Sequence, residues 1–158
     1  VDTRDGADIV RSRIGLEAKA VVVKPEDDIY ALFAGCYFDR AAVIVDECQF
    51  LKEEQVDQLS RIVMDYEIPV FCFGLSTDFT THLFEGSRRL FEIAESIVEI
   101  KSVCRCGKKA TVNARIDDKG NVVFSGEQVV LGGNDRYVPM CRKCWLEEKA
   151  KQKLQEKS

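Results

Sequence analysis

The sequence predicts an α/β protein in which a mostly parallel sheet with flanking helices is followed by a small, metal-bound β subdomain. In the first hundred residues, short apolar runs typical of buried strands alternate with segments of helical periodicity. One apolar run, residues 43–45, ends abruptly in two carboxylates, Asp46 and Glu47. From residue 104 onward the alternation stops, and two close pairs of cysteines appear instead. Alternating strands and helices imply parallel strands joined by right-handed crossovers.

The first half of the predicted sheet consists of two strands and the helix between them. The run Ala-Val-Val-Val at 20–23 indicates a strand, closed by the Lys-Pro that follows. The helix expected at 26–38 carries apolar residues at helical spacing. Three acidic residues at its start complement the positive end of the helix dipole. The central strand, expected at 42–46, comes next.

The second half of the sheet follows the same order. Apolar residues recur every three or four positions over 52–66, which predicts an amphipathic helix. The run at 69–74 is typical of another buried strand. We expect a further helix around 90–94 and a last strand at 97–100.

The seven cysteines divide by their surroundings. Three of them, Cys36, Cys48 and Cys72, lie singly in apolar or mixed segments and are most simply buried thiols. The other four form the pairs Cys104-x-Cys106 and Cys141-x-x-Cys144. Close pairs in a cytosolic chain favour a metal over disulfides, and four thiolates suit a tetrahedral structural zinc ion. Because cysteine fills all four positions, no open position remains for metal catalysis.

Composition narrows the classes of function. The chain has 158 residues, a net charge of −4 and no polybasic block, so a general nucleic-acid or membrane surface is not expected. No apolar stretch is long enough to cross a bilayer and no signal-peptide pattern opens the chain, which favours the cytoplasm. Five basic residues flank the cysteine pairs and could contact phosphates, but no stacking aromatics are interleaved with them.

The carboxylates after the central strand have two interpretations. Ligands of open α/β sheets bind beyond the carboxyl ends of the strands, where Asp46 and Glu47 lie. In nucleotide-dependent enzymes an Asp at such a place helps to hold Mg²⁺, and a neighbouring residue handles the nucleophile. The alternative is a strand followed by a solvated acidic turn.

Several motifs in fixed order resemble the type II thymidine kinase family, which includes the cytosolic thymidine kinase of animal cells. The motifs are Asp2-Thr3-Arg4, Asp46-Glu47-Cys48-Gln49-Phe50, Gly74-Leu75-Ser76-Thr77-Asp78-Phe79, Phe84-Glu85-Gly86 and Gly132-Gly133-Asn134-Asp135-Arg136-Tyr137. The resemblance covers residues 1–148, and the tight Cys104-x-Cys106 pair is similar to the bacterial branch. It implies a P-loop kinase-like core at 1–101, a zinc-binding lasso subdomain at 102–146 and a charged tail at 147–158.

The resemblance also implies a reaction, the transfer of the γ-phosphoryl group of ATP to the 5′-hydroxyl of thymidine with Mg²⁺. Glu47 would accept the hydroxyl proton, and Asp46 would help to bind Mg²⁺ through water. Arg4 would lie near the phosphates, with Asp2 a weaker candidate. The implied partners are thymidine, ATP and thymidine triphosphate as a feedback inhibitor, in a homotetramer.

The same resemblance assigns the thymine site to aromatic and apolar side chains and to the lasso loop at about 122–137. The pocket would be lined by Phe50, Leu75, Phe79 and Phe84, with Val130 and its backbone neighbours contacting the base and Tyr137 reaching the sugar. Asn113 stands where some relatives carry Thr. The plain alternatives are that Phe79 and Phe84 are core residues, that Tyr137 and Arg4 lie at the surface, and that His82 is an ordinary loop side chain.

The chain departs from the family pattern in two places. The family begins with a strand and a Gly-x-x-x-x-Gly-Lys-Ser/Thr phosphate loop, and the 158 residues contain no such motif. We therefore expect a fragment of a longer protein, or a chain that lacks this front and is by itself not an efficient kinase. Ser76 stands where the family often has Asp. The competing hypothesis is a non-catalytic zinc-ribbon binding module on an α/β scaffold.

Overall fold

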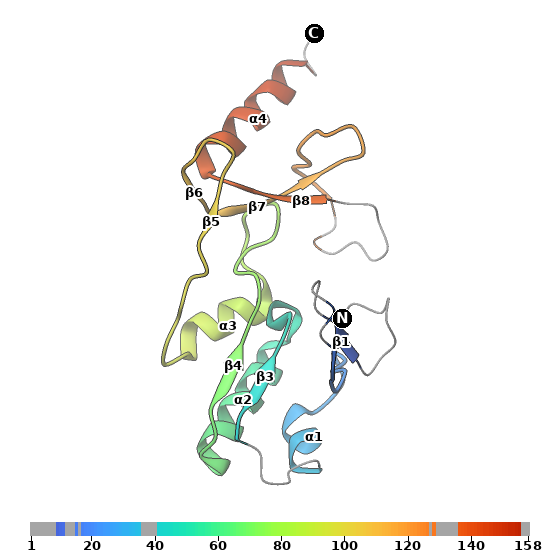
Figure 1. Cartoon of the computed structure of the whole chain (residues 1–158), viewed down its shortest axis with the longest axis vertical. Coiled ribbons are helices and arrows are strands. Elements are labelled where there is room, and N and C mark those ends of the chain that lie inside the picture. The colour runs from blue at the N-terminus through green and yellow to red at the C-terminus, as the bar shows by residue number, and fades with distance from the viewer. Residues whose placement is uncertain are drawn as a thin grey trace. The chain divides into compact units, whose positions relative to one another are not determined.

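The computed structural model describes residues 9–11, 15, 17–35, 41–126, 128 and 136–155. The chain divides into two compact units, Val1–Gly74 and Leu75–Ser158. Each unit is described by itself below, with the elements labelled as in Figure 1. Among the described residues, no helix is both long enough and apolar enough to cross a membrane. The domain boundaries expected from the sequence stay a prediction.

The first unit contains one parallel and one antiparallel pair of strands with two helices. Its elements are β1 (Ile9–Arg11), β2 (Glu17–Lys19), α1 (Ile29–Gly35), β3 (Val43–Val45), a 3-10 turn (Cys48–Phe50), α2 (Glu53–Tyr66) and β4 (Val70–Cys72). β1 and β2 pair in antiparallel fashion, whereas β3 and β4 are parallel, with Val45 opposite Cys72. The strands predicted at 42–46 and 69–74 are therefore confirmed, and their parallel direction agrees with the predicted parallel sheet.

Helix α2 confirms the helix predicted over 52–66. Its apolar stripe is buried at Val56, Leu59 and Ile62, and it packs against α1 and β4 (Figure 1). Buried Gln55 donates from Nε2 to the carbonyls of Lys24 and Asp27, at 2.8 and 3.0 Å. These bonds attach the start of α2 to the loop before α1.

Two of the predicted strands are wrong. Residues 20–23 follow β2 without forming a strand, and residues 97–100 form no strand either. In the second case Val98 and Ile100 are 84% and 82% exposed. An extended apolar run becomes a strand only where a neighbour supplies its hydrogen bonds, and none of the described residues pairs with either run.

The mixed α/β class is confirmed, but a single mostly parallel sheet is not. Among the described residues the strands form four two-stranded sheets, and only β3–β4 is parallel. The helix expected at 26–38 is described over Ile29–Gly35, and its predicted end at 36–38 lies outside the described residues.

The second unit begins with an irregular loop and one helix, then turns to short antiparallel strands. Its elements are α3 (Glu85–Ile93), β5 (Ser102–Val103), β6 (Lys109–Ala110), β7 (Val112–Ile116), β8 (Arg136–Met140) and α4 (Arg142–Gln155). β5 pairs with β6, and β7 pairs with β8 so that Asn113 lies opposite Pro139 and Arg115 opposite Tyr137. The helix predicted around 90–94 corresponds to α3, which begins five residues earlier.

The core of this unit is small and includes cysteines. The buried cluster consists of Cys104, Val112, Ala114, Val122, Met140, Cys141, Cys144 and Trp145. Phe124 packs against the ring of Trp145 edge to face, with centroids 5.1 Å apart. So few apolar residues bury little surface, and three of the paired cysteines belong to this buried cluster.

Candidate metal centre and active-site residues

The first cysteine pair lies in the tight turn between β5 and β6. The N–H of Gly107 donates to the carbonyl of Cys104 at 2.8 Å, and the N–H of Cys104 donates to the carbonyl of Lys108 at 2.8 Å. Gly107 has φ +81°, a left-handed conformation that costs glycine nothing. This turn lets both thiols of the Cys-x-Cys pair join the cluster of four.

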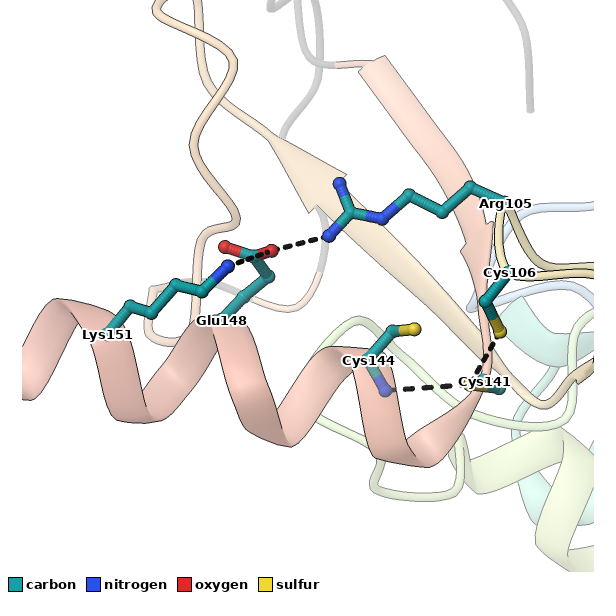
Figure 2. A network of polar contacts seen from close by, with 6 residues as sticks. All are labelled: Arg105, Cys106, Cys141, Cys144, Glu148 and Lys151. Atoms are coloured by element: carbon teal, nitrogen blue, oxygen red, sulfur yellow. Dashed lines mark hydrogen bonds and ion pairs between the residues drawn. The ribbon is translucent and has the colours of Figure 1, made fainter.

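The second pair spans the junction of β8 and α4. Cys141 directly follows β8, and the N–H of Cys144, in the first turn of α4, points at the Cys141 sulfur at 3.5 Å (Figure 2). The Cys106 and Cys141 sulfurs are 3.6 Å apart, and all four sulfurs lie within 4.8 Å of one another. Four thiolates about 2.3 Å from one tetrahedral ion are separated by about 3.8 Å. The cluster could therefore hold a metal ion.

The surroundings of the cluster favour thiolate. Backbone N–H groups of Cys106 and Cys141 donate to the sulfur of Cys104 and lower the pKa of that thiol to about 6. The sulfurs of Cys141 and Cys106, together with burial, raise the pKa of Cys144 to about 12. The Cys104 thiolate is thus already favoured at neutral pH, whereas Cys144 keeps its proton. A bound cation would offset the repulsion among four thiolates and so favour the loss of that proton.

An ion-pair network lies beside the cysteines. Arg105, between the first two cysteines, donates to Glu148 of α4 at 2.5 Å, and Lys151 reaches the same oxygen at 3.2 Å (Figure 2). Arg105 and Lys151 lower the pKa of Glu148. The network ties the β5–β6 turn to α4 independently of the sulfurs.

Asp46 and Glu47 lie directly beyond the carboxyl end of β3, as predicted. Both are exposed, and the N–H of Glu47 donates to Asp46 Oδ1 at 2.9 Å. Glu47 has φ 52°, an uncommon conformation for a residue other than glycine. Buried Gln49 donates from Nε2 to Glu47 Oε2 at 2.5 Å. The Glu47 carboxylate is therefore held in one orientation while it stays accessible.

Gly74 leaves room for this arrangement. A Cβ at Gly74 would collide with Gln49 Oε1 and would lie 2.7 Å from the sulfur of Cys48. The backbones also approach closely, because the N–H of Cys48 donates to the carbonyl of Phe73 at 3.0 Å. Position 74, just after β4, therefore favours glycine, because any side chain there would press on Gln49, the residue that orients Glu47.

Residues 75–84, here called the pocket loop, fold around one buried carboxylate. Asp78 Oδ1 accepts bonds from the backbone N–H of Thr80 at 2.9 Å, the Thr80 hydroxyl at 2.7 Å and the N–H of His82 at 3.0 Å. Its Oδ2 accepts a bond from Gln128 Nε2 at 3.1 Å. Burial raises the pKa of Asp78, but the bonds from Thr80, His82 and Gln128 outweigh burial and leave that pKa lowered.

The pocket loop carries three of the predicted thymine-site residues. Phe79 and Phe84 are 1% and 5% exposed, and Leu75 is 42% exposed. The Arg115 guanidinium lies over the Phe79 ring, 5.1 Å from its centroid. Ser87 of α3 donates its hydroxyl to the Leu75 carbonyl at 2.6 Å. His82 takes part in the loop through its backbone, in line with an ordinary loop residue.

The remaining predicted residues are not gathered into one site by the described contacts. Phe50 is exposed at the end of the 3-10 turn, and Tyr137 is exposed on β8. Asn113 lies on β7 and is half-buried. Arg4 and Val130 lie outside the described residues, as do Asp2 and half of the predicted lasso, residues 127 and 129–135.

Sequence reasoning missed the side chains that support these groups. The supporting hydrogen bonds and ring contacts are made by Gln49, Asp78, Arg115, Gln128 and Arg142. Of these five residues, only Gln49 and Asp78 stand within a motif of the family resemblance. A buried Asp followed two residues later by Thr is a recognisable turn pattern. Gln128 and Arg115 are far in the sequence from the residues they contact, Asp78 and Phe79, so no local sequence pattern indicates these contacts.

The described residues form a mixed α/β protein with an acidic strand end and a four-cysteine cluster that could hold a metal ion. A family model described as "Thymidine kinase" matches residues 1–145. The thymidine kinase of Vibrio vulnificus strain YJ016 is 46% identical over 149 residues, covering 93% of this chain and 78% of the relative. Those of Listeria innocua and Zymomonas mobilis are 45% and 42% identical, covering 91% and 94% of this chain and 76% and 78% of the relatives.

This chain belongs to the thymidine kinase family. The family predicted from the motifs is therefore confirmed, and the relatives named above are bacterial, as the cysteine spacing predicted.

Proposed function

We propose that this chain supplies the catalytic carboxylate and the nucleoside site of a kinase that transfers the γ-phosphoryl group of ATP to the 5′-hydroxyl of thymidine. The observation that carries the proposal is the family match over residues 1–145, with relatives named thymidine kinase at 42–46% identity. The product is thymidine monophosphate, a precursor for DNA synthesis by salvage.

Glu47 is the general base in this proposal. Phosphoryl transfer through a loose transition state asks mainly for positioning and modest proton acceptance, which a carboxylate can supply. The bond from buried Gln49 supports the role, because it fixes the carboxylate while leaving it exposed to a substrate hydroxyl. Asp46, exposed beside it, suits a water-mediated contact to Mg²⁺, since that ion prefers carboxylate oxygens and keeps several waters. When bound with ATP, Mg²⁺ neutralises charge on the phosphates.

The thymine site in this proposal combines rigid and accessible side chains. Buried Phe79 and Phe84 form the fixed back of the pocket, since burial locks their rings, and exposed Leu75 and Phe50 offer apolar surface to the base. Tyr137, exposed on β8, reaches the sugar, and Val130 contacts the base through its backbone. Arg4 contacts the phosphates.

The four-cysteine cluster holds zinc in this proposal. Thiolate-rich tetrahedral sites select zinc, and a site with four protein ligands is structural. Cys104 and Cys106 of the β5–β6 turn and Cys141 and Cys144 at the start of α4 would hold the ion, which would add a link between these two segments. By family analogy the protein is a homotetramer in the cytoplasm, inhibited by thymidine triphosphate.

The proposed activity is tested by incubating the complete product of the gene with thymidine, ATP and Mg²⁺ and separating the nucleotides by chromatography. Thymidine monophosphate is expected, with one ADP formed per thymidine consumed. Formation of ADP without thymidine monophosphate, or no reaction by a protein that binds both substrates, would contradict the assignment.

A further inference from the structure

Three side chains from the metal-binding part of the second unit contact the pocket loop. Gln128 donates to Asp78 at 3.1 Å, and Arg142 donates from Nη1 to the Thr81 hydroxyl at 2.9 Å. Arg115 of β7 covers the ring of Phe79. The loop that carries Phe79 and Phe84 is therefore fixed from outside as well as from within.

Asp78 is the centre of these contacts. It is 7% exposed, and its two oxygens face different partners. Oδ1 accepts three bonds from within the loop, whereas Oδ2 accepts its bond from a residue 50 positions away. Hydrogen bonds to an ionised group are stronger than bonds between neutral groups. One carboxylate thus shapes the loop and also attaches it to Gln128.

Arg142 extends the connection to the cysteines. It stands between Cys141 and Cys144, and its guanidinium lies 4.8 Å from the centroid of the Trp145 ring. The same side chain reaches Thr81, which has φ 76°. A residue other than glycine keeps such a conformation only when its surroundings hold it there. The position of the Cys141–Cys144 segment is therefore linked to the conformation of the pocket loop through Arg142.

We propose that Asp78 and Gln128 are positioning residues for the nucleoside site, because their contact holds the pocket loop in the form that receives the base. Neither side chain needs to touch the nucleoside. The inference rests on the proposed function, since it takes thymidine as the ligand of the pocket loop.

The test exchanges donor and acceptor. Gln128→Glu puts a carboxylate against the Asp78 carboxylate and should weaken thymidine binding about tenfold or more, because the bond becomes a repulsion. Asp78→Asn combined with Gln128→Glu reverses the polarity, since the asparagine amide can donate to the new carboxylate while its oxygen still accepts from Thr80 and His82. The double variant should bind thymidine within about twofold of the unaltered protein. Gln128→Ala removes the donor without adding charge and should weaken binding by a smaller factor, about threefold.

Gln152→Glu is the matched control. Gln152 donates to the Val122 carbonyl at 2.7 Å in the same unit. The Gln152→Glu variant introduces the same charge as Gln128→Glu and loses the bond to the Val122 carbonyl. It should therefore lower thermal stability yet leave the thymidine dissociation constant unchanged. Each variant is measured by calorimetric titration of thymidine at 25 °C, with circular dichroism and zinc content recorded in parallel.

The outcomes separate the two proposals. Unaltered binding by Gln128→Glu and Gln128→Ala, a double variant as weak as the single one, or an equal loss in Gln152→Glu would each overturn the positioning role. Failure of the folded, unaltered protein to bind thymidine would instead overturn the proposed function on which the role rests.

Discussion

The two compact units bury their apolar residues in different ways. In the first unit, α2 buries one stripe, while Ile44 and Phe71, which face each other across β3 and β4, are 72% and 50% exposed. In the second unit, Trp145 and its neighbours form a closed core with three of the four clustered cysteines inside it. The first unit thus relies on a helix packed against strands, and the second on a few side chains around a candidate metal site.

This difference predicts different dependence on metal. A core of so few residues gains little from the burial of apolar surface, so we expect a metal ion held by the cysteine cluster to supply much of its folding free energy. All four cysteines of the cluster belong to the second unit. Metal removal should therefore disturb the second unit and leave the helices of the first in place.

The largest effect is expected from Cys141→Ser. Structural zinc contributes on the order of 10 kcal/mol to folding in small domains, so loss of one thiolate should release the metal and open the core of the second unit. Trp145, the single tryptophan of the chain, lies in that core and reports its state by fluorescence. We expect less than about 0.1 zinc per chain, a red-shifted emission and weakened thymidine binding.

Cys72→Ser is the control for that experiment, because Cys72 lies in β4, outside the cluster. It should keep one zinc per chain and the native emission. Native fluorescence in zinc-free Cys141→Ser would contradict the claim that the core of the second unit depends on the metal.

The next largest effect concerns Glu47→Gln in the complete gene product. An amide cannot accept the proton, so turnover should fall about 10²-fold or more while thymidine binding stays nearly unchanged. Glu67→Gln is the matched control, because Glu67 has a similar left-handed backbone, with φ 53°, and caps the end of α2. Turnover of Glu47→Gln equal to that of the control would remove Glu47 from the catalytic step.

A smaller effect is expected from Gly74→Ala. The added methyl group would meet Gln49 and Cys48, so the side chain that orients Glu47 must move. We expect a loss of about 1–3 kcal/mol in the free energy of unfolding, measured with urea, together with reduced turnover. Gly35→Ala at the end of α1 meets no atom within 4 Å and should be neutral or slightly stabilising. Equal stability of the two variants would mean that the segment after β4 can yield.

The smallest effect belongs to Glu148. Its pKa is lowered in the folded state by Arg105 and Lys151, so its contribution is present above about pH 5 and is lost as the pH falls through the folded pKa. Glu148→Gln should lower the free energy of unfolding by less than about 1 kcal/mol at pH 7 and leave it unchanged at pH 3. Urea titrations followed by Trp145 emission measure both values; a loss of equal size at the two pH values would exclude the ion pair as its cause.

Local patterns account for what could be predicted from the sequence. The stripe of α2, the carboxylates after β3 and the four cysteines are each encoded by residues close together, and the structure has each of them. The strands predicted at 20–23 and 97–100 are absent because an apolar run forms a strand only where a partner strand is present. The bond from Gln128 to Asp78 could not be predicted, since Gln128 lies 50 residues away and is an ordinary polar residue in the sequence.

The most direct test of the account is calorimetric titration of thymidine into the protein before and after removal of zinc with a chelator. We predict one zinc per chain, thymidine binding by the zinc-loaded protein, loss of binding on chelation and its return when zinc is restored. A folded, zinc-loaded protein that does not bind thymidine, or one that binds it equally well without metal, would contradict the account.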